Sequence, residues 1–226
     1  MGKTAIILGA TGLTGGILLR KLIDDENYST IKLFSRRTVG IKSSKIKEYL
    51  IDVLALKQSA KDFTADEVFC CIGTTTAKTK DKKLYKAIDY GIPVTASKLA
   101  KQHNIATFIV MSSMGADAKS AVFYNRTKGE MERDVLKQSI PNTYILRPSL
   151  IGGNRNENRV GERIGKAIMR IINPIMIGNL KKYKMIYPEK IANCMHFLAN
   201  TNTNTNTNTT ILTSDEIQEI SNSITS

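Results

Sequence analysis

The feature that most constrains this chain is a glycine-rich turn near its start. Gly9, Gly12 and Gly15 follow the apolar run 4–8 and lead into the helical pattern 13–23. Glycines at such a junction let the turn close, let backbone approach a pyrophosphate and let helix pack on strand, while the first N–H groups of the helix attract anions. The pattern predicts a dinucleotide-binding loop. Its expected contact residues are Gly9, Thr11, Gly12, Leu13, Thr14 and Gly15.

Short apolar runs alternate with longer helical patterns along the rest of the chain, which is typical of βαβ units. We therefore expect a doubly wound, mostly parallel α/β sheet of the Rossmann type, flanked by helices. The expected strands are 4–8, 31–34, 48–53, 68–72, 108–111 and 144–146. The expected helices are 13–23, 82–103, 123–136, 164–172 and 189–198. Pro93 should bend the second of these helices or move its boundary.

No change of composition divides the 226 residues, so we expect a single domain over 1–226, in which 151–226 supplies a small substrate-side region. The alternating Thr-Asn tract 201–210 has no apolar face and predicts an exposed loop. A short edge strand at 211–212 and a helix starting at 214–216 are expected after it.

Composition excludes several functional classes. The net charge of +13 comes from lysines and arginines that are spread along the chain without interleaved aromatic residues, so we expect no nucleic-acid binding. No apolar run reaches the roughly 20 residues that a membrane span needs. Three cysteines and no export signal favour the cytoplasm. The two histidines lack neighbouring metal ligands, so no metal site is expected.

The residues after the second strand indicate which dinucleotide binds. An NAD-selective site usually places a carboxylate there to accept bonds from the ribose hydroxyls. Here Arg36 and Arg37 stand at that point, and two guanidinium groups suit a 2′-phosphate, so NADP(H) is the expected cofactor. The alternative is that both arginines lie on a solvated loop and bind no phosphate. After the next two strands, Asp52 and Val53 could border the adenine, and Gly73, Thr74 and Thr75 could line the pyrophosphate and nicotinamide ribose.

A second group of residues suggests proton transfer. Tyr124 and Lys128 lie four residues apart, hence on one helix face, soon after the fifth strand. A nearby lysine stabilises a phenolate, which lets a tyrosine act as acid or base. Ser112 and Ser113 end the fifth strand, where one hydroxyl could polarise a carbonyl, and strand alternation lets only one of them face the site.

Together these residues resemble the short-chain dehydrogenase/reductase superfamily. The segments 71–75, 112–117, 128–130 and 147–148 are similar to its atypical, NADPH-binding Tat-interacting-protein branch, and the resemblance covers roughly residues 4 to 200. It implies that Ser113 orients the substrate, Tyr124 transfers the proton and Lys128 holds the nicotinamide ribose. Asp89 is the nearest match for the asparagine that often completes the proton relay. Arg147 and Pro148 resemble the edge of the substrate pocket.

The resemblance implies an NADPH-dependent oxidoreductase that acts on a small carbonyl or alcohol, and a possible homodimer. Two alternatives remain open. The first is a cofactor-binding regulator or partner-interaction protein with little turnover. The second is a nucleotide-sugar epimerase, for which the sequence after the sixth strand is short.

Overall fold

The computed structural model describes residues 2–152, 183–201 and 208–224. Its centre is a seven-stranded sheet in the order β3-β2-β1-β4-β5-β6-β7, and every neighbouring pair of strands is parallel. The strands are β1 Lys3–Leu8, β2 Tyr28–Ser35, β3 Ile46–Leu50, β4 Glu67–Cys70, β5 Thr107–Met111, β6 Asn142–Arg147 and β7 Asn208–Thr213. The doubly wound parallel sheet predicted from the sequence is confirmed.

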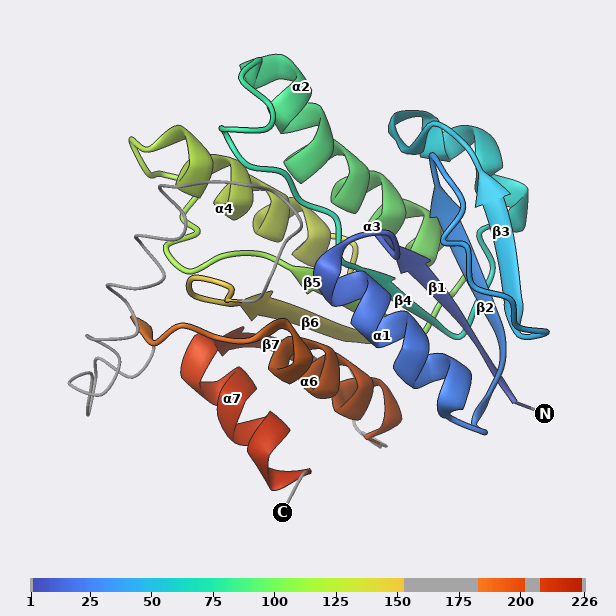
Figure 1. Ribbon diagram of the computed structural model, residues 1–226. Helices are drawn as coiled ribbons and strands as arrows, with labels where there is room; N and C mark the ends of the chain where they lie inside the picture. The colour runs from blue at the N-terminus through green and yellow to red at the C-terminus, as the bar shows by residue number, and fades with distance from the viewer. Residues whose placement is uncertain (1, 153–182, 202–207, 225–226) are drawn as a thin grey trace.

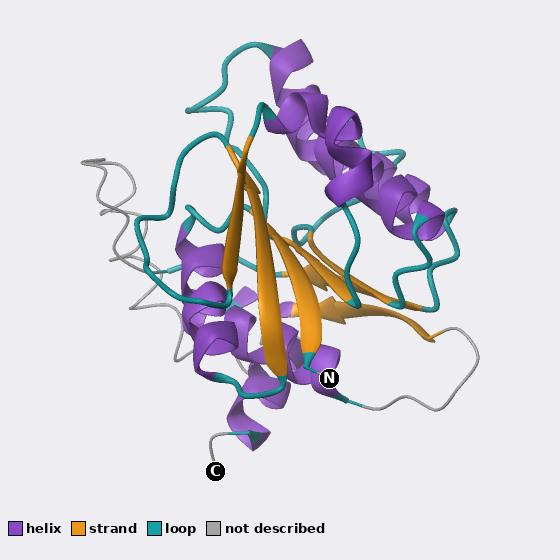
Figure 2. Ribbon diagram, turned by 90° about the vertical axis from the view of Figure 1, so that its right-hand side faces the viewer, coloured by secondary structure: helices purple, strands orange, loops and turns teal. Residues whose placement is uncertain are grey.

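Helices cover both faces of this sheet (Figures 1 and 2). They are α1 Leu13–Asp24, α2 Lys82–Lys86, α3 Ile92–Gln102, α4 Phe123–Leu136, α6 Pro188–Asn200 and α7 Ser214–Ser223, with a 3₁₀ segment η1 at Val53–Asp62 and a π-helical turn η2 at Ala87–Gly91. Helices α1, α6 and α7 lie on one face, and η1, α3 and α4 lie on the other. No helix within the described ranges is long and apolar enough to cross a membrane.

Alternating side chains of the strands supply both hydrophobic cores. Along β1, Ala5 and Ile7 pack toward α1 and α6, whereas Ile6 and Leu8 pack toward α3 and α4. All four are fully buried because a parallel sheet is covered on both faces. This explains why the central strands appear in the sequence as continuous apolar runs.

The third strand is shorter than predicted. It ends at Leu50 rather than at Val53. The Asp52 carboxylate accepts a hydrogen bond from the Leu54 N–H at 3.0 Å and caps η1, so the chain turns into a 3₁₀ segment before the apolar run ends.

The boundary expected at Pro93 is found, because a separate helical element, α3, begins at Ile92 with Pro93 in its first turn. Residues 82–102 form one continuous run in which α2, η2 and α3 follow each other, and the junctions keep right-handed helical angles. The Ile92 N–H bonds to the carbonyl of Ala87, five residues back. Because proline lacks an N–H and crowds the carbonyl four residues before it, the wider π turn accommodates the ring.

The Thr-Asn tract is partly a strand. The prediction of a loop over 201–210 is wrong for residues 208–210, which belong to β7 and pair with β6. Thr209 lies beside Thr143 and Thr210 beside Tyr144, and β-branched threonines suit such pairing. The capping box of Thr213 and Glu216 then starts α7, as expected. The helix predicted at 164–172 lies outside the described residues.

Candidate functional site

The glycine turn joins β1 to α1 at the carboxyl end of the sheet. Gly9 has a φ of +88°, a left-handed conformation that favours glycine. A Cβ on Gly15 would lie 2.2 Å from the Gly9 carbonyl oxygen, so helix and turn touch through backbone alone. The Gly12 N–H closes the turn by donating to the Gly9 oxygen at 2.9 Å. These contacts give the close backbone packing that the sequence predicted.

The amino end of α1 is free to bind an anion. Gly12 caps the helix without a side-chain hydrogen bond, and the first turn holds no acidic residue. Thr11 and Gly12 are exposed, Leu13 is half-buried, and Thr14 is buried behind them. Unbonded N–H groups at a helix start attract phosphate oxygens. The residues present therefore fit a dinucleotide pyrophosphate.

Arg36 and Arg37 follow β2, the strand beside β1, and both are exposed. Neither guanidinium makes a hydrogen bond or ion pair in the described part of the chain. The turn is held instead by the Ser35 hydroxyl, which donates to the Arg37 carbonyl at 2.7 Å. Both side chains are thus available to a ligand at this edge of the glycine turn.

Asp52 and Val53, the two residues expected near the adenine, both have structural roles in this fold. Asp52 is exposed and uses its carboxylate to cap η1, and Val53 is buried against the sheet. The fold places both after β3, one strand further from the glycine turn than the arginines.

A buried ion pair lies at the carboxyl ends of β4 and β5. Lys128 of α4 contacts Asp89 of the π turn at 2.8 Å, with 4% and 0% of their side chains exposed. The second oxygen of Asp89 accepts the Thr74 N–H at 2.7 Å. A Cβ on Gly73 would lie 3.8 Å from Lys128 Nζ, so the loop after β4 runs directly beside the pair. Thr75 lies one residue further on.

Asp89 keeps Lys128 charged. Burial alone lowers the pKa of a lysine, but attraction to Asp89 and to Tyr124 outweighs it and raises the pKa of Lys128. Its ammonium also donates to the Met111 carbonyl, at 3.4 Å. Lys128 is therefore a fixed cation beside the end of β5, and Asp89, which the sequence offered only as a positional candidate, is its partner.

Ser112 and Ser113 are both buried, but their hydroxyls have different surroundings. The Ser112 hydroxyl donates to Glu132, which also accepts two bonds from the Arg147 guanidinium, one of them at 2.9 Å. The Ser113 hydroxyl, on a residue 7% exposed, makes no hydrogen bond within the described residues. Ser112 and Arg147 thus link β5 and β6 to α4 through Glu132. The Ser113 hydroxyl remains available to a ligand.

Tyr124 stands in the first turn of α4, one turn before Lys128, and is half-buried. Its ring meets the edge of the Tyr85 ring at a centroid distance of 6.4 Å, and Tyr85 also contacts Phe123 at 5.5 Å. A Cβ on Gly129 would come within 2.1 Å of the Ala118 nitrogen, so the loop after β5 crosses α4 closely there. The fold thus brings the beginning of α4 to the carboxyl end of β5.

Unpartnered polar atoms gather at this place. Among the described residues, five buried side-chain polar atoms lack a hydrogen bond: those of Tyr85, Asp89, Ser113, His103 and Asn193. Two of the five, the hydroxyls of Tyr85 and Ser113, belong to this site and have no partner, whereas the Asp89 oxygen there is paired with Lys128 at 2.8 Å. A buried polar group without a partner costs about 1–3 kcal/mol. Such a concentration marks a site built to bind a polar ligand.

Sequence reasoning did not identify Tyr85 and Glu132 as members of this region. Both could have been found from helical spacing. Tyr85 precedes Asp89 by one turn, and Glu132 follows Lys128 by one turn. The signal is weak because polar residues at this spacing are common on exposed helix faces.

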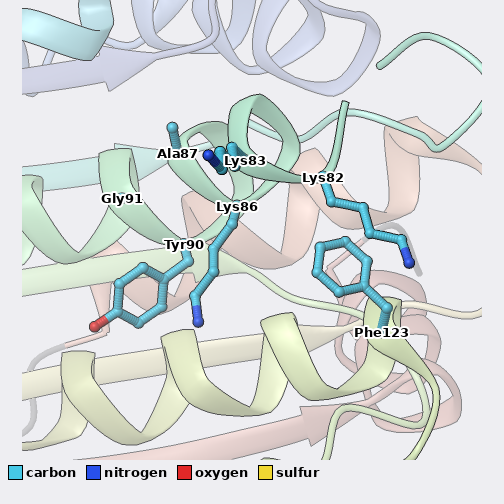
Figure 3. A pocket seen from close by; sticks show the side chains of 7 residues that line it. All are labelled: Lys82, Lys83, Lys86, Ala87, Tyr90, Gly91 and Phe123. Atoms are coloured by element: carbon cyan, nitrogen blue, oxygen red, sulfur yellow. The ribbon is translucent and has the colours of Figure 1, made fainter. Parts of the chain in front are cut away.

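An open groove of about 500 Å³ lies between α2, η2 and α4 (Figure 3). In it Lys82 lies over the Phe123 ring at 5.6 Å, and Lys86 lies over Tyr90 and pairs with Glu130 at 2.6 Å. Neither Ser113, Tyr124 nor Lys128 lines this groove, so it is separate from the site above. No cluster of metal-ligand side chains occurs in the described ranges.

The sheet order, the glycine turn and the site at the ends of β4 and β5 define an NAD(P)-binding Rossmann domain. Comparison with known proteins agrees with this class. The chain matches the NAD(P)H-binding family over residues 9–167 and belongs to that family.

Several curated proteins are similar in sequence. The mitochondrial protein FMP52-1 of Scheffersomyces stipitis is 33% identical over 183 residues, which cover 79% of this chain and 76% of that protein. The FMP52 protein of Candida albicans is 28% identical and covers 98% of this chain and 99% of its own length. Protein HTATIP2 of Rattus norvegicus is 30% identical over 168 residues, or 73% of this chain and 69% of that protein.

Solved structures share the fold at low sequence identity. The Bordetella bronchiseptica enzyme WbmG in complex with NAD has a TM-score of 0.67 at 12% identity and covers 98% of this chain and 77% of its own. The UDP-glucuronic acid 4-epimerase of Bacillus cereus in complex with NAD has a TM-score of 0.67 at 15% identity, over 93% and 78% of the two chains. These likenesses show the fold alone.

The cytoplasmic location expected from the sequence is wrong by these comparisons, because the FMP52 relatives are named as mitochondrial proteins. The expectation rested on free cysteines and on the lack of an export signal. Such features do not separate the cytoplasm from another reducing compartment.

Proposed function

We propose that this protein is an NADP(H)-dependent oxidoreductase that transfers hydride to or from a small carbonyl or alcohol substrate. The observation that carries the proposal is the buried Lys128–Asp89 ion pair, one helical turn from Tyr124, together with Ser113 just after β5, whose hydroxyl has no partner among the described residues. Perturbed charged groups next to an available hydroxyl are typical of catalytic sites.

Ser113 and Tyr124 would have separate roles in the reduction of a carbonyl group. Ser113 donates a hydrogen bond to the carbonyl oxygen and holds it in place. A nicotinamide coenzyme bound at the glycine turn would supply the hydride. As the carbonyl carbon gains hydride, its oxygen gains a proton from the Tyr124 hydroxyl, so that an alcohol and a tyrosinate result. Oxidation of an alcohol runs through the same groups in reverse.

Lys128 would support this step by its fixed positive charge. A phenolate forming on Tyr124 would lie near the ammonium group, which favours it electrostatically. The same ammonium group could hold the nicotinamide ribose by hydrogen bonds. Asp89 keeps the ammonium in position, and Gly73 brings the loop after β4 close to both members of the ion pair.

We propose NADP(H) rather than NAD(H) because Arg36 and Arg37 are exposed, without partners in the described chain, at the end of β2. Charge-assisted bonds to a 2′-phosphate contribute about 1.5–3 kcal/mol each. Replacing either arginine by alanine should weaken NADPH binding by roughly tenfold to a hundredfold and leave NADH binding unchanged. Arg20→Ala, an exposed arginine on α1, is the matched control.

The decisive experiment titrates the purified protein with NADPH and NADH and then follows coenzyme oxidation with a panel of aldehydes and ketones. Tyr124→Phe should lower turnover by about 10²- to 10⁴-fold and leave NADPH affinity unchanged. Tyr90→Phe is its control, because that hydroxyl bonds to Asp134 away from the site. Ser113→Ala should lose turnover, whereas Ser112→Ala should mainly lower stability.

Other outcomes would contradict the proposal in distinct ways. Tight NADPH binding without turnover would favour a cofactor-binding regulator. Coenzyme that stays bound through purification and is regenerated within each turnover would favour an epimerase. Failure to bind either dinucleotide would contradict both cofactor and reaction.

A further inference from the structure

Tyr85 is a second tyrosine of the site, and the proposed reaction does not use it. It lies on α2, only 1% of the residue is exposed, and its hydroxyl has no hydrogen-bond partner in the described chain. Tyrosine hydroxyls that are buried usually find a partner. An unpartnered one therefore calls for a functional explanation.

The position of Tyr85 follows from two matched contacts between neighbouring helices. Tyr85 meets Tyr124 ring to ring, and one turn further along each helix Asp89 meets Lys128. Because both helices advance by four residues between these contacts, they run parallel here, and both phenols precede the ion pair. Tyr85 thus belongs to the same layer of the site as Tyr124.

The Tyr85 ring is held from two sides. Its edge contacts with Phe123 and Tyr124 have interplanar angles of 63° and 70°. The Asp89 carboxylate, one helical turn further along, is already paired with Lys128 and with the Thr74 N–H. The hydroxyl is left as a rigid donor whose acceptor is not supplied by these neighbours.

Tyr85 should remain protonated during the reaction. Burial, and then the charges on Asp89 and Tyr124, raise the pKa of its phenol well above the ordinary value. It is therefore a hydrogen-bond donor and not a second general base. This difference separates the role of Tyr85 from the role proposed for Tyr124.

We propose that the Tyr85 hydroxyl donates a hydrogen bond to a second oxygen of the substrate, so that the site favours carbonyl compounds carrying a nearby hydroxyl or carbonyl group. The inference rests on the proposed function, in which Ser113 and Tyr124 serve the reacting oxygen. A site that presents a buried donor selects against ligands that cannot pair with it, because the donor then stays unsatisfied.

The test compares two ketones that differ by one hydroxyl group, 2-butanone and 3-hydroxy-2-butanone. With NADPH, wild-type protein should show a KM for the hydroxyketone about tenfold below that for butanone. Tyr85→Phe should remove this difference by raising the KM for the hydroxyketone alone, with the kcat for butanone unchanged. Tyr90→Phe, the same substitution on the neighbouring π turn, should behave as wild type.

A binding measurement keeps the test independent of turnover. Ligand-observed NMR would follow both ketones with the NADP⁺-loaded wild-type and Tyr85→Phe proteins. If neither ketone is reduced but only wild type prefers the hydroxyketone in binding, the proposed reaction fails and the role of Tyr85 stands. An equal effect of Tyr85→Phe on both ketones, or no preference in wild type, would overturn the inference.

Discussion

Two buried polar clusters lie at opposite ends of the same sheet, and they differ in how well their hydrogen bonds are satisfied. At the amino ends of the strands, Glu67 accepts bonds from Tyr28 and, at 3.3 Å, from Lys3, while Asn200 donates to the Tyr28 hydroxyl at 3.2 Å. Lys3 also bonds to the Ala199 carbonyl at 2.8 Å. This amino-end cluster ties β1, β2 and β4 to the end of α6.

At the carboxyl ends, by contrast, the hydroxyls of Tyr85 and Ser113 have no partner in the described chain. Burial is similar in the two places, since Tyr28 and Tyr85 are each 1% exposed. Satisfied polar groups stabilise a fold, whereas unsatisfied ones are tolerated where a ligand will meet them. The comparison therefore separates structural from ligand-binding polarity within a single sheet.

The largest expected effect on the free energy of unfolding comes from breaking the Lys128–Asp89 ion pair of the carboxyl-end site. Lys128→Met should lower the free energy of unfolding by about 3–5 kcal/mol, because it leaves the Asp89 carboxylate buried without its cation. Urea unfolding measures the loss. The double variant Lys128→Met with Asp89→Asn should recover much of it. Wild-type stability in the single variant would show that the pair is not buried as described.

A matched pair of substitutions tests the comparison most directly. Tyr28→Phe removes a hydroxyl that bonds to Glu67 and Asn200, so it should cost about 1–3 kcal/mol. Tyr85→Phe removes a hydroxyl without such bonds and should leave the free energy of unfolding unchanged or slightly higher. Thermal or urea unfolding of both variants checks this. Equal losses would remove the distinction between the two ends.

The smallest effect concerns the pH dependence of the amino-end cluster. Burial raises the pKa of Glu67 above its ordinary value of 4.5, although the bonds from Tyr28 and Lys3 oppose the shift. A carboxyl with a raised folded-state pKa gives stability that is present below 4.5 and is lost as pH rises through the folded-state pKa.

Wild type should therefore lose stability relative to Glu67→Gln as pH rises above 4.5, by about 1 kcal/mol, or roughly 2–4 °C in Tm. Melting curves of both proteins across this range measure the difference. A gap in Tm that stays constant with pH, or one that changes in the other direction, would show that the Glu67 pKa is not raised.

Much of the fold could be predicted because parallel strands covered on both faces leave a strong pattern of apolar runs. Errors arose where a helix cap or a long-range strand pairing decided the outcome. Asp52 ends β3 early by capping η1, and pairing with β6 turns residues 208–210 into a strand. Neither partner is visible from hydrophobic periodicity.

The candidate site could be predicted in part. Spacing placed Tyr124 and Lys128 on one helix face, but the choice between Ser112 and Ser113 depended on Glu132, a partner 20 residues away from Ser112 in the chain. Asp89 and Tyr85 come from a helix that sequence alone could not align with α4. Long-range pairings of this kind follow from how helices pack, and no local motif encodes them.

The π turn at Ala87–Gly91 amounts to one extra residue in an otherwise regular helix. Removing a single residue there would let the remaining residues close into an ordinary α-helical turn, with the segments on either side kept in register. Tyr85 precedes the turn, whereas the buried side chains Ala96, Leu99 and Ala100 follow it and pack on the sheet. The wide turn therefore lets one helix carry an extra residue while Tyr85 keeps its place in the site and the side chains after the turn keep theirs in the core.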